Sequence, residues 1–219
     1  MNVRRTVITG VTASAFMLSG AMAFDLPKMP SIGGSAKVDV DGLSKQQAEM
    51  LGALTVALQQ LSQAQSQMAE ALGLKEQAAT AKNTAETLKN GTLTGKDDID
   101  KQLTSSLEVQ ASINDQLKSH AKLDEQSRSK FAASLPPYGA GALATVVVGK
   151  KTADTVKSLG TVTDPTVLSK LSALLYVGTK APTMISNFGG ATSNIVAFAK
   201  SNGVDTSDFE KNAASKMGG

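Results

Sequence analysis

The sequence predicts an all-α fold: a helical bundle with long amphipathic helices in its N-terminal half and shorter, glycine-punctuated helices in its C-terminal half. Three observations lead to this prediction. Tryptophan and cysteine are absent and aromatic residues make up 4% of the chain, so the core must consist of aliphatic side chains and alanine. Leucines recur at helical spacing in the first half. Capping and stop signals divide the remainder into segments of helical length.

The first 23 residues are typical of a secretory signal peptide. Arg4 and Arg5 provide the charged start, residues 7–22 are uncharged and mostly apolar or small, and residues 21–23 (Ala-Met-Ala) offer a small-x-small cleavage pattern. The alternative is an uncleaved anchor, although the apolar stretch is barely long enough to cross a bilayer core of about 30 Å. We therefore predict a bacterial protein with a Sec-type signal, located in the periplasm or outside the cell.

Charge and cysteine content exclude several classes of function. Beyond residue 23 the chain carries 20 basic against 19 acidic residues, and Arg128 is its one arginine. This balance argues against nucleic-acid binding, which needs a concentrated basic face. The absence of cysteine excludes disulfides, thiol catalysis and cysteine metal sites. Packing alone must then stabilise the fold.

An extended leader and then a long helix are predicted after residue 23. Residues 24–43 predict an extended leader because proline and glycine interrupt any helical period, and Ser44 with Gln47 predicts a capping box. Apolar residues then recur at spacings of three, four and seven until Gly73, which is placed to end the helix or to permit a bend. We name this set the leucine stripe; it consists of Leu51, Leu54, Leu58, Leu61, Met68 and Leu72. Such a coiled-coil-like stripe buries itself against another helix, and we predict that it is an interaction surface.

Two further helices follow in the N-terminal half. Residues 75–89 predict a weaker, alanine-rich helix that stops at Asn90-Gly91. A third long helix is expected to begin at Asp97, whose carboxylate would cap it. Because Pro136 and Pro137 interrupt helical hydrogen bonding, we expect this helix to end near Ala133.

The C-terminal half predicts shorter helices near 141–159, 165–179, 183–189, 191–202 and 206–216. Asp164-Pro165 is a good start signal, since proline at the first helical position loses a donor that had no partner. Residues 146–148 are three valines, which leave a short strand open as an alternative. The chain thus divides into a long-helix segment, 44–137, and a compact helical segment, 138–219, which form one domain or two.

Patterns that carry catalysis or bind metals are weak. His120 is the single histidine, with Asp124 as the one acidic neighbour able to share its helix face, which is too few ligands for a metal site. Residues 119–122 and 127–130 match the S-x-x-K pattern of serine β-lactamases, but the S-D-N and K-T-G elements that the chemistry needs are missing. The acidic residues at 97, 98 and 100 suit the first turn of a helix. We predict no enzymatic activity, no cofactor and no metal ion.

Two stretches of 19 residues, 131–149 and 181–199, contain no charged residue. Neither is a continuous apolar segment of transmembrane type, because prolines, asparagines and glycines interrupt them. Small residues within both would let helices approach closely. Tightly packed core helices, a lipid-binding cavity and a conditional membrane inserter are the three interpretations.

Two functional predictions follow from these features. The first is a non-enzymatic periplasmic or secreted protein that scaffolds or binds another macromolecule at the cell envelope, with a protein partner or self-association through the leucine stripe. The second is a lipid-binding or conditionally membrane-active helical protein that uses the apolar region 131–199.

Overall fold

The computed structural model describes residues 40–119, 122–159 and 164–211, all of them in or between helices, which confirms the all-α prediction. The predicted signal peptide, residues 24–39 of the predicted leader, and His120 lie outside the described residues. In chain order the elements are α1 (Val40–Ala71), α2 (Lys75–Asn90), α3 (Lys96–Lys118), α4 (Glu125–Ser158), α5 (Pro165–Lys170), α6 (Ser172–Met184), the π-helix η1 (Ile185–Gly189) and α7 (Gly190–Ser201). Residues 207–211 form a further short helical segment.

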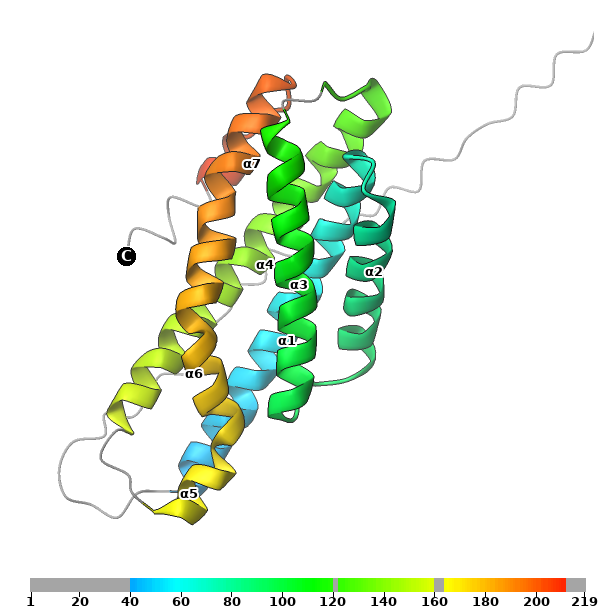
Figure 1. The fold of residues 1–219 in the computed structure, drawn as a ribbon. Helices are drawn as coiled ribbons and strands as arrows, with labels where there is room; N and C mark the ends of the chain where they lie inside the picture. The colour runs from blue at the N-terminus through cyan, green and yellow to red at the C-terminus, as the bar shows by residue number, and fades with distance from the viewer. Residues whose placement is uncertain (1–39, 120–121, 160–163, 212–219) are drawn as a thin grey trace, which may run out of the picture.

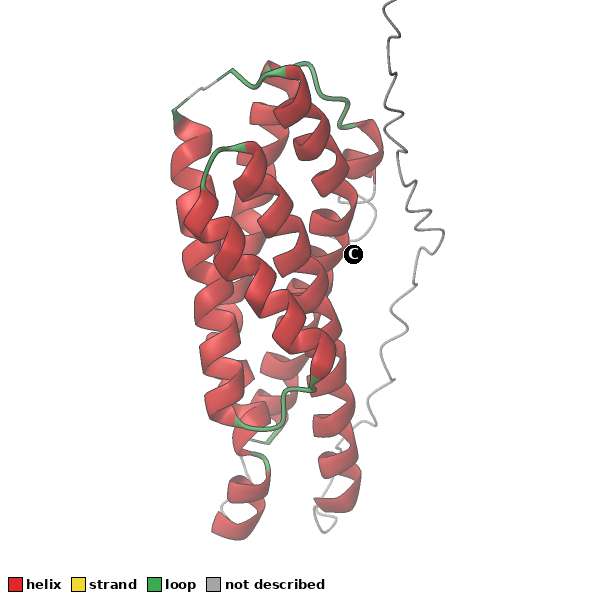
Figure 2. Cartoon of the chain, turned by 90° about the vertical axis from the view of Figure 1, so that its right-hand side faces the viewer, coloured by secondary structure: helices red, strands yellow, loops and turns green. Residues whose placement is uncertain are grey.

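The long helices run roughly along one axis and form a bundle (Figures 1 and 2). Figure 1 shows α3 at the front, between α2 on one side and α6–α7 on the other, with α4 behind it. The most extensive packing is that of α1 on α4 and on α2, followed by that of α4 on α6. Helix α4 is therefore the helix around which the two halves of the chain meet.

Helix α1 begins earlier than the capping box predicts. It starts at Val40, so Ser44 lies inside the helix and does not cap it. Gln47 instead serves α6: its Oε1 accepts a hydrogen bond from the backbone N–H of Leu174 at 3.1 Å, and its Nε2 donates to the carbonyl of Lys170 at 3.1 Å. The start of α6 thus receives its cap from another helix. Of the two roles expected for Gly73, the structure shows the helix end and not the bend, because α1 stops at Ala71 and Gly73 follows with φ of 77°.

The predicted third helix is two helices in the structure. Helix α3 starts at Lys96 after Gly95, so Asp97 lies in the first turn and does not cap. It ends at Lys118, and α4 begins at Glu125, where the carboxylate of Asp124 accepts a hydrogen bond from the N–H of Ser127 at 2.7 Å. Asp124 is therefore an N-cap.

Helix α4 passes through Pro136 and Pro137, so the expected helix end near Ala133 was wrong. Each internal proline costs about 3 kcal/mol because it removes a hydrogen bond and crowds the preceding turn. Burial on either side offsets this cost, since Phe131, Leu135 and Tyr138 are almost completely buried and each large apolar side chain contributes about 1.5–3 kcal/mol. The valines at 146–148 also lie within α4, so the strand alternative was wrong.

The last helices follow one another with little interruption. Asp164 caps α5 through the N–H of Thr166 at 2.8 Å, which confirms the predicted start. Helices α6, η1 and α7 then continue without a break from Ser172 to Ser201, where three separate helices were expected. Pro182 lacks the donor that a regular α-helix needs, and the π-helix follows directly after its turn. Asn187 Nδ2 donates to the carbonyl of Thr183 at 2.9 Å within this turn.

One buried polar network lies between α1 and α3. Gln65 Nε2 donates to the carbonyl of Ser106 at 2.9 Å and to Gln110 Oε1 at 3.0 Å, while Ser106 Oγ donates to Gln65 Oε1 at 2.9 Å. Gln110 Nε2 extends the network by donating to Asn114 Oδ1 at 3.1 Å. Gln65 and Gln110 are fully buried, and the network satisfies groups that would otherwise destabilise the core.

Candidate functional site: an uncharged helical hairpin

The two uncharged stretches of the sequence pack against each other in the fold. Residues 131–149 belong to α4, and residues 181–199 run through α6, η1 and α7 in the opposite direction (Figure 1). We call these two stretches together the hairpin. A lysine stands directly at each of their four ends, and these lysines are Lys130, Lys150, Lys180 and Lys200.

The two helical stretches of the hairpin are in register from one end to the other. At one end the rings of Phe131 and Phe198 have centroids 5.2 Å apart. At the other end Gly149 faces Ala181, where a Cβ on the glycine would lie 3.6 Å from the alanine Cα. Because both end pairs match, the charged residues begin at the same level on both helices, and the uncharged unit is about 28 Å long at 1.5 Å per residue.

Small residues bring α1 close to the hairpin. A Cβ at Gly141 would lie 2.5 Å from the backbone N of Leu61 and 3.0 Å from the carbonyl O of Ala57. The two helices therefore touch backbone to backbone at this point, and no larger residue fits without moving one of them. The facing stretch of α1, residues 50–69, also lacks charged residues, although it contains five glutamines.

Most of the hairpin is buried in the closed bundle. Within 131–149 the exposed residues are Ala133, Pro136 and Ala140. The stretch 181–199 exposes a face of small or polar uncharged residues. Among the described residues, 125–157 of α4 are the one helical stretch long and apolar enough to cross a bilayer by length and composition, and more than half of its most apolar part is buried. A buried core helix of a soluble protein has the same properties, so this finding alone assigns no membrane role.

A small apolar pocket lies where the hairpin meets residue 209. Gly139 of α4 and Phe188 of η1 line it together with Phe209, and its volume is about 10 Å³. That volume holds about one water molecule, whereas small-molecule sites occupy about 300 Å³ or more. This pocket is therefore too small to hold a lipid in the closed bundle.

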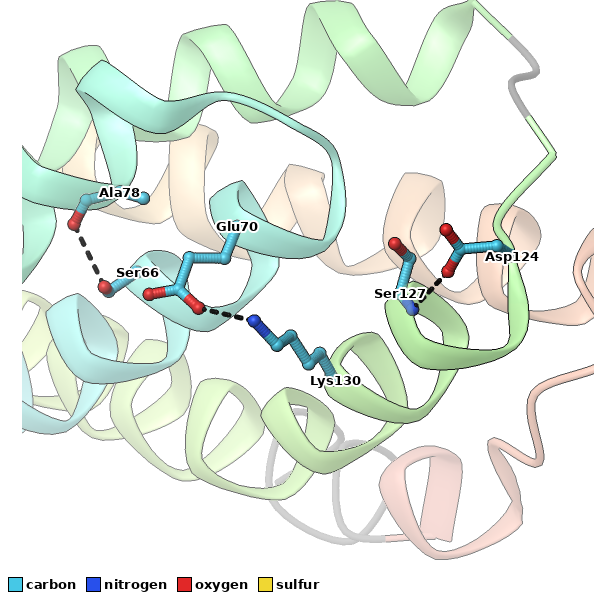
Figure 3. A network of polar contacts seen from close by, with 6 residues as sticks. All are labelled: Ser66, Glu70, Ala78, Asp124, Ser127 and Lys130. Carbon is cyan, nitrogen blue, oxygen red and sulfur yellow. Dashed lines mark hydrogen bonds and ion pairs between the residues drawn. The ribbon is translucent and has the colours of Figure 1, made fainter.

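Ion pairs connect three ends of the hairpin to the rest of the bundle. Lys130 Nζ lies 3.0 Å from Glu70 Oε2 at the end of α1 (Figure 3). Lys200 Nζ lies 2.8 Å from Glu210 Oε1 in the segment 207–211. Lys180 Nζ lies 3.6 Å from Asp100 Oδ1 in the first turns of α3. In each pair the lysine belongs to the end of the hairpin and the carboxylate to another element.

The pair at Lys180 is part of a larger polar cluster between α3 and α6. The hydroxyl of Tyr176 donates a hydrogen bond to Asp100, and the ammonium groups of Lys96 and Lys180 lie 5.5 and 5.2 Å from the centroid of the Tyr176 ring. The hydrogen bond from Tyr176, followed by the charge of Lys180, lowers the pKa of Asp100. Similarly, the hydrogen bond from Lys200, with that from Thr206, lowers the pKa of Glu210. Both carboxylates are therefore ionised at neutral pH.

The leucine stripe lies inside the bundle. Leu54, Leu58, Leu61 and Met68 are fully buried, Leu51 and Leu72 nearly so, and all six belong to one continuous apolar core that also includes residues of α2, α3 and α4. The stripe thus packs within its own chain. Its predicted role as a surface for another molecule stays a prediction.

The S-x-x-K residues have other partners and do not form nucleophile–base pairs. Ser119 Oγ donates to the carbonyl of Gln116 at 2.7 Å, and Lys122 Nζ donates to the carbonyl of Ser201 at 2.8 Å. Lys130 pairs with Glu70, as described above. Within the described ranges, no group of three or more His, Cys, Asp or Glu side chains is placed to hold a metal ion.

Tyr138 of α4 has a buried hydroxyl with no hydrogen-bond partner among the described residues. Burial raises its pKa above the 10.0 of an exposed tyrosine. The unfolded chain therefore releases this proton near pH 10 while the folded chain retains it, so Tyr138 makes stability fall as the pH rises above about 10.

We predict that Tyr138→Phe stabilises the fold and flattens this alkaline decline. Removing the unpaired buried hydroxyl should add about 1 kcal/mol to the free energy of unfolding, because an unsatisfied buried polar group costs about 1–3 kcal/mol. Urea unfolding of the variant and of the wild-type protein at pH 7 and pH 10.5 measures both effects. A destabilised Tyr138→Phe protein would show that the hydroxyl has a partner.

The sequence contained the signal for the hairpin but not for its partners. Two uncharged stretches of equal length with lysines at their ends are visible in the chain. Glu70, Asp100, Glu210 and Tyr176 were missed, because nothing in the local sequence pairs them with distant lysines. Comparisons of the chain with protein-family models, curated proteins and solved structures found no match.

Proposed function

We propose that this protein is a non-enzymatic helical protein of the bacterial cell envelope that inserts its hairpin into a lipid bilayer. The observation that carries the proposal is the register of the hairpin: two uncharged 19-residue helical stretches lie antiparallel, with a lysine at each of the four ends. Its length of about 28 Å is close to the hydrocarbon thickness of about 30 Å. The periplasmic or extracellular location predicted from the first 23 residues would bring it to such a surface.

The end lysines suit this function. A lysine at the end of a membrane helix extends its ammonium group to the headgroup region while its methylene chain stays in the apolar layer. Small residues at the contact of the two helices, such as Gly149 and Ala181, would let them remain in contact in lipid, where association depends on close packing. The closed bundle is then the water-soluble form, in which α1 and α3 cover the apolar faces.

The scaffold function expected first has less support from the geometry. It relied on the leucine stripe, whose side chains are buried in contacts within the chain. Val56, at 38% exposure, is the one large apolar side chain exposed among the described residues. No extended apolar surface for a protein partner follows from these observations, and binding to another macromolecule is left as a prediction.

Single-cysteine labelling tests the proposal, because the chain contains no cysteine. We predict that a polarity-sensitive nitrobenzoxadiazole dye on Ala140→Cys, an exposed position in the hairpin, shifts to the blue and brightens when the protein is mixed with phosphatidylcholine–phosphatidylglycerol vesicles. The same dye on Ala111→Cys, an exposed position of α3, should not change. Release of an entrapped dye from the same vesicles gives a second readout.

Two results would contradict the proposal. If neither dye responds at any vesicle concentration, the hairpin does not enter lipid. If both respond equally, the whole chain adsorbs or unfolds on the membrane, and the hairpin is not the inserting unit.

A further inference from the structure

The end lysines of the hairpin already have anionic partners in the closed bundle. Lys130, Lys180 and Lys200 pair with carboxylates that lie on α1, on α3 and in the segment 207–211. These three elements are outside the hairpin and differ from one another. The hairpin is thus held to the rest of the fold by ion pairs at both of its ends.

Insertion would separate Lys130 and Lys180 from their carboxylates, and it would separate Lys200 from Glu210 unless the segment 207–211 moves with α7. A carboxylate cannot follow its lysine unless its own element moves with the hairpin, and Glu70 and Asp100 belong to the covering helices α1 and α3. The lysines would then need other anionic groups with oxygen ligands, located at the surface of the bilayer. Phospholipid headgroups provide negatively charged phosphate oxygens at that level.

We infer that anionic phospholipids are the partner that opens the bundle, and that their headgroups replace Glu70, Asp100 and Glu210 as the counterions of Lys130, Lys180 and Lys200. The inference rests on the proposed function, since it names the lipid that the hairpin enters. The exchange is between like ion pairs, so the loss of the internal pairs opposes opening only weakly. Each of the three pairs is solvent-accessible, where a single ion pair contributes little.

Protonation is a less suitable trigger than lipid charge. The hydrogen bond from Tyr176 and the charges of Lys180 and Lys96 keep the pKa of Asp100 below its usual range, and Lys200 and Thr206 do the same for Glu210. For groups with a lowered pKa, the stabilising interaction is present above the unfolded pKa and is lost only as the pH falls through the lower, folded value. Opening should therefore depend on lipid charge at neutral pH and on salt.

The experiment compares two triple variants with the same change in net charge. The first, Glu70→Gln with Asp100→Asn and Glu210→Gln, removes the counterions of the hairpin lysines. The matched control, Glu108→Gln with Asp115→Asn and Asp208→Asn, removes exposed carboxylates that do not face these lysines; Asp115 and Asp208 pair with lysines in their own helical segments. Each carries the Ala140→Cys dye, and circular dichroism confirms that each is folded.

On vesicles containing phosphatidylglycerol, we expect the first variant to insert at about three- to tenfold lower lipid concentration than the matched control, since three individually weak pairs are removed. A third variant, Lys130→Gln with Lys180→Gln and Lys200→Gln, should lose the preference for these vesicles over pure phosphatidylcholine. Equal insertion of the two carboxylate variants, or an unchanged lipid preference in the lysine variant, would overturn the inference while the insertion of the wild-type protein still supported the proposed function. Failure of the wild-type protein to insert into either vesicle would overturn both.

Discussion

Replacing Gly141 by alanine is expected to destabilise the bundle by about 1–3 kcal/mol, the usual cost of overpacking a tight core. A Cβ at this position would lie 2.5 Å from the backbone N and 2.8 Å from the Cα of Leu61, so it meets a helix backbone and not a movable side chain. One of the two helices must shift. The intrinsic preference of helices for alanine, about 1 kcal/mol over glycine, works in the opposite direction and is smaller than the clash.

Gly52→Ala is the matched control for this prediction. Gly52 also lies in a helix, but a Cβ there meets nothing within 4 Å, so the substitution should stabilise the protein by up to about 1 kcal/mol. Urea unfolding followed by circular dichroism measures both variants. If Gly141→Ala were as stable as Gly52→Ala, α1 and α4 would have to lie farther apart than the structure places them. Because the same contact holds α1 on the hairpin, Gly141→Ala should also insert into vesicles at lower lipid concentration.

Replacing Leu58 by aspartate is expected to prevent folding. Leu58 is fully buried in the core, and an unpaired carboxylate there costs several kcal/mol in addition to the lost apolar contacts. Domains have a total stability of about 5–15 kcal/mol, so this single change removes much or all of it. The measurement is the far-ultraviolet circular dichroism signal at neutral pH together with the elution volume in gel filtration.

Val56→Asp separates a core role of the leucine stripe from an interface role. Val56 lies two residues away on the same helix and is 38% exposed, so its replacement should leave the fold intact. If Leu58→Asp stayed folded and lost only self-association, the stripe would be an intermolecular surface, as the sequence suggested, and its packing in the structure would be wrong.

Local signals predicted elements well where they acted through the backbone alone. The Asp164-Pro165 start, the Gly73 end and the stop at Asn90-Gly91 all depend on the geometry of a few neighbouring residues, and the structure confirms them. Pro136-Pro137 misled because the local penalty of two prolines was outweighed by buried residues on both sides. Gln47 misled for a related reason, since its side chain caps a helix that lies more than a hundred residues away in the chain.

The uncharged stretches of the candidate site could be predicted from the sequence, whereas their register and their counterions could not, because these depend on contacts between distant residues. Absence of charge over 131–149 and 181–199 is a property of the sequence, and it already indicated close packing or lipid contact. The antiparallel register of these stretches depends on particular contacts such as Phe131 with Phe198, which no local pattern specifies. The counterions Glu70 and Asp100 are each at least 60 residues from their lysines, so only the folded chain brings them together.

The polar network of Gln65, Ser106 and Gln110 determines which helices can separate when the bundle opens. Sliding or separating α1 and α3 would leave several buried amide and hydroxyl groups without partners, each at a cost of about 1–3 kcal/mol. On its other side, α1 meets α4 at Gly141 through backbone and aliphatic atoms that lipid can replace. A bundle that opens at the surface of a membrane will therefore part between α1 and α4, and α1 will remain joined to α3 as a unit that keeps its own hydrogen bonds.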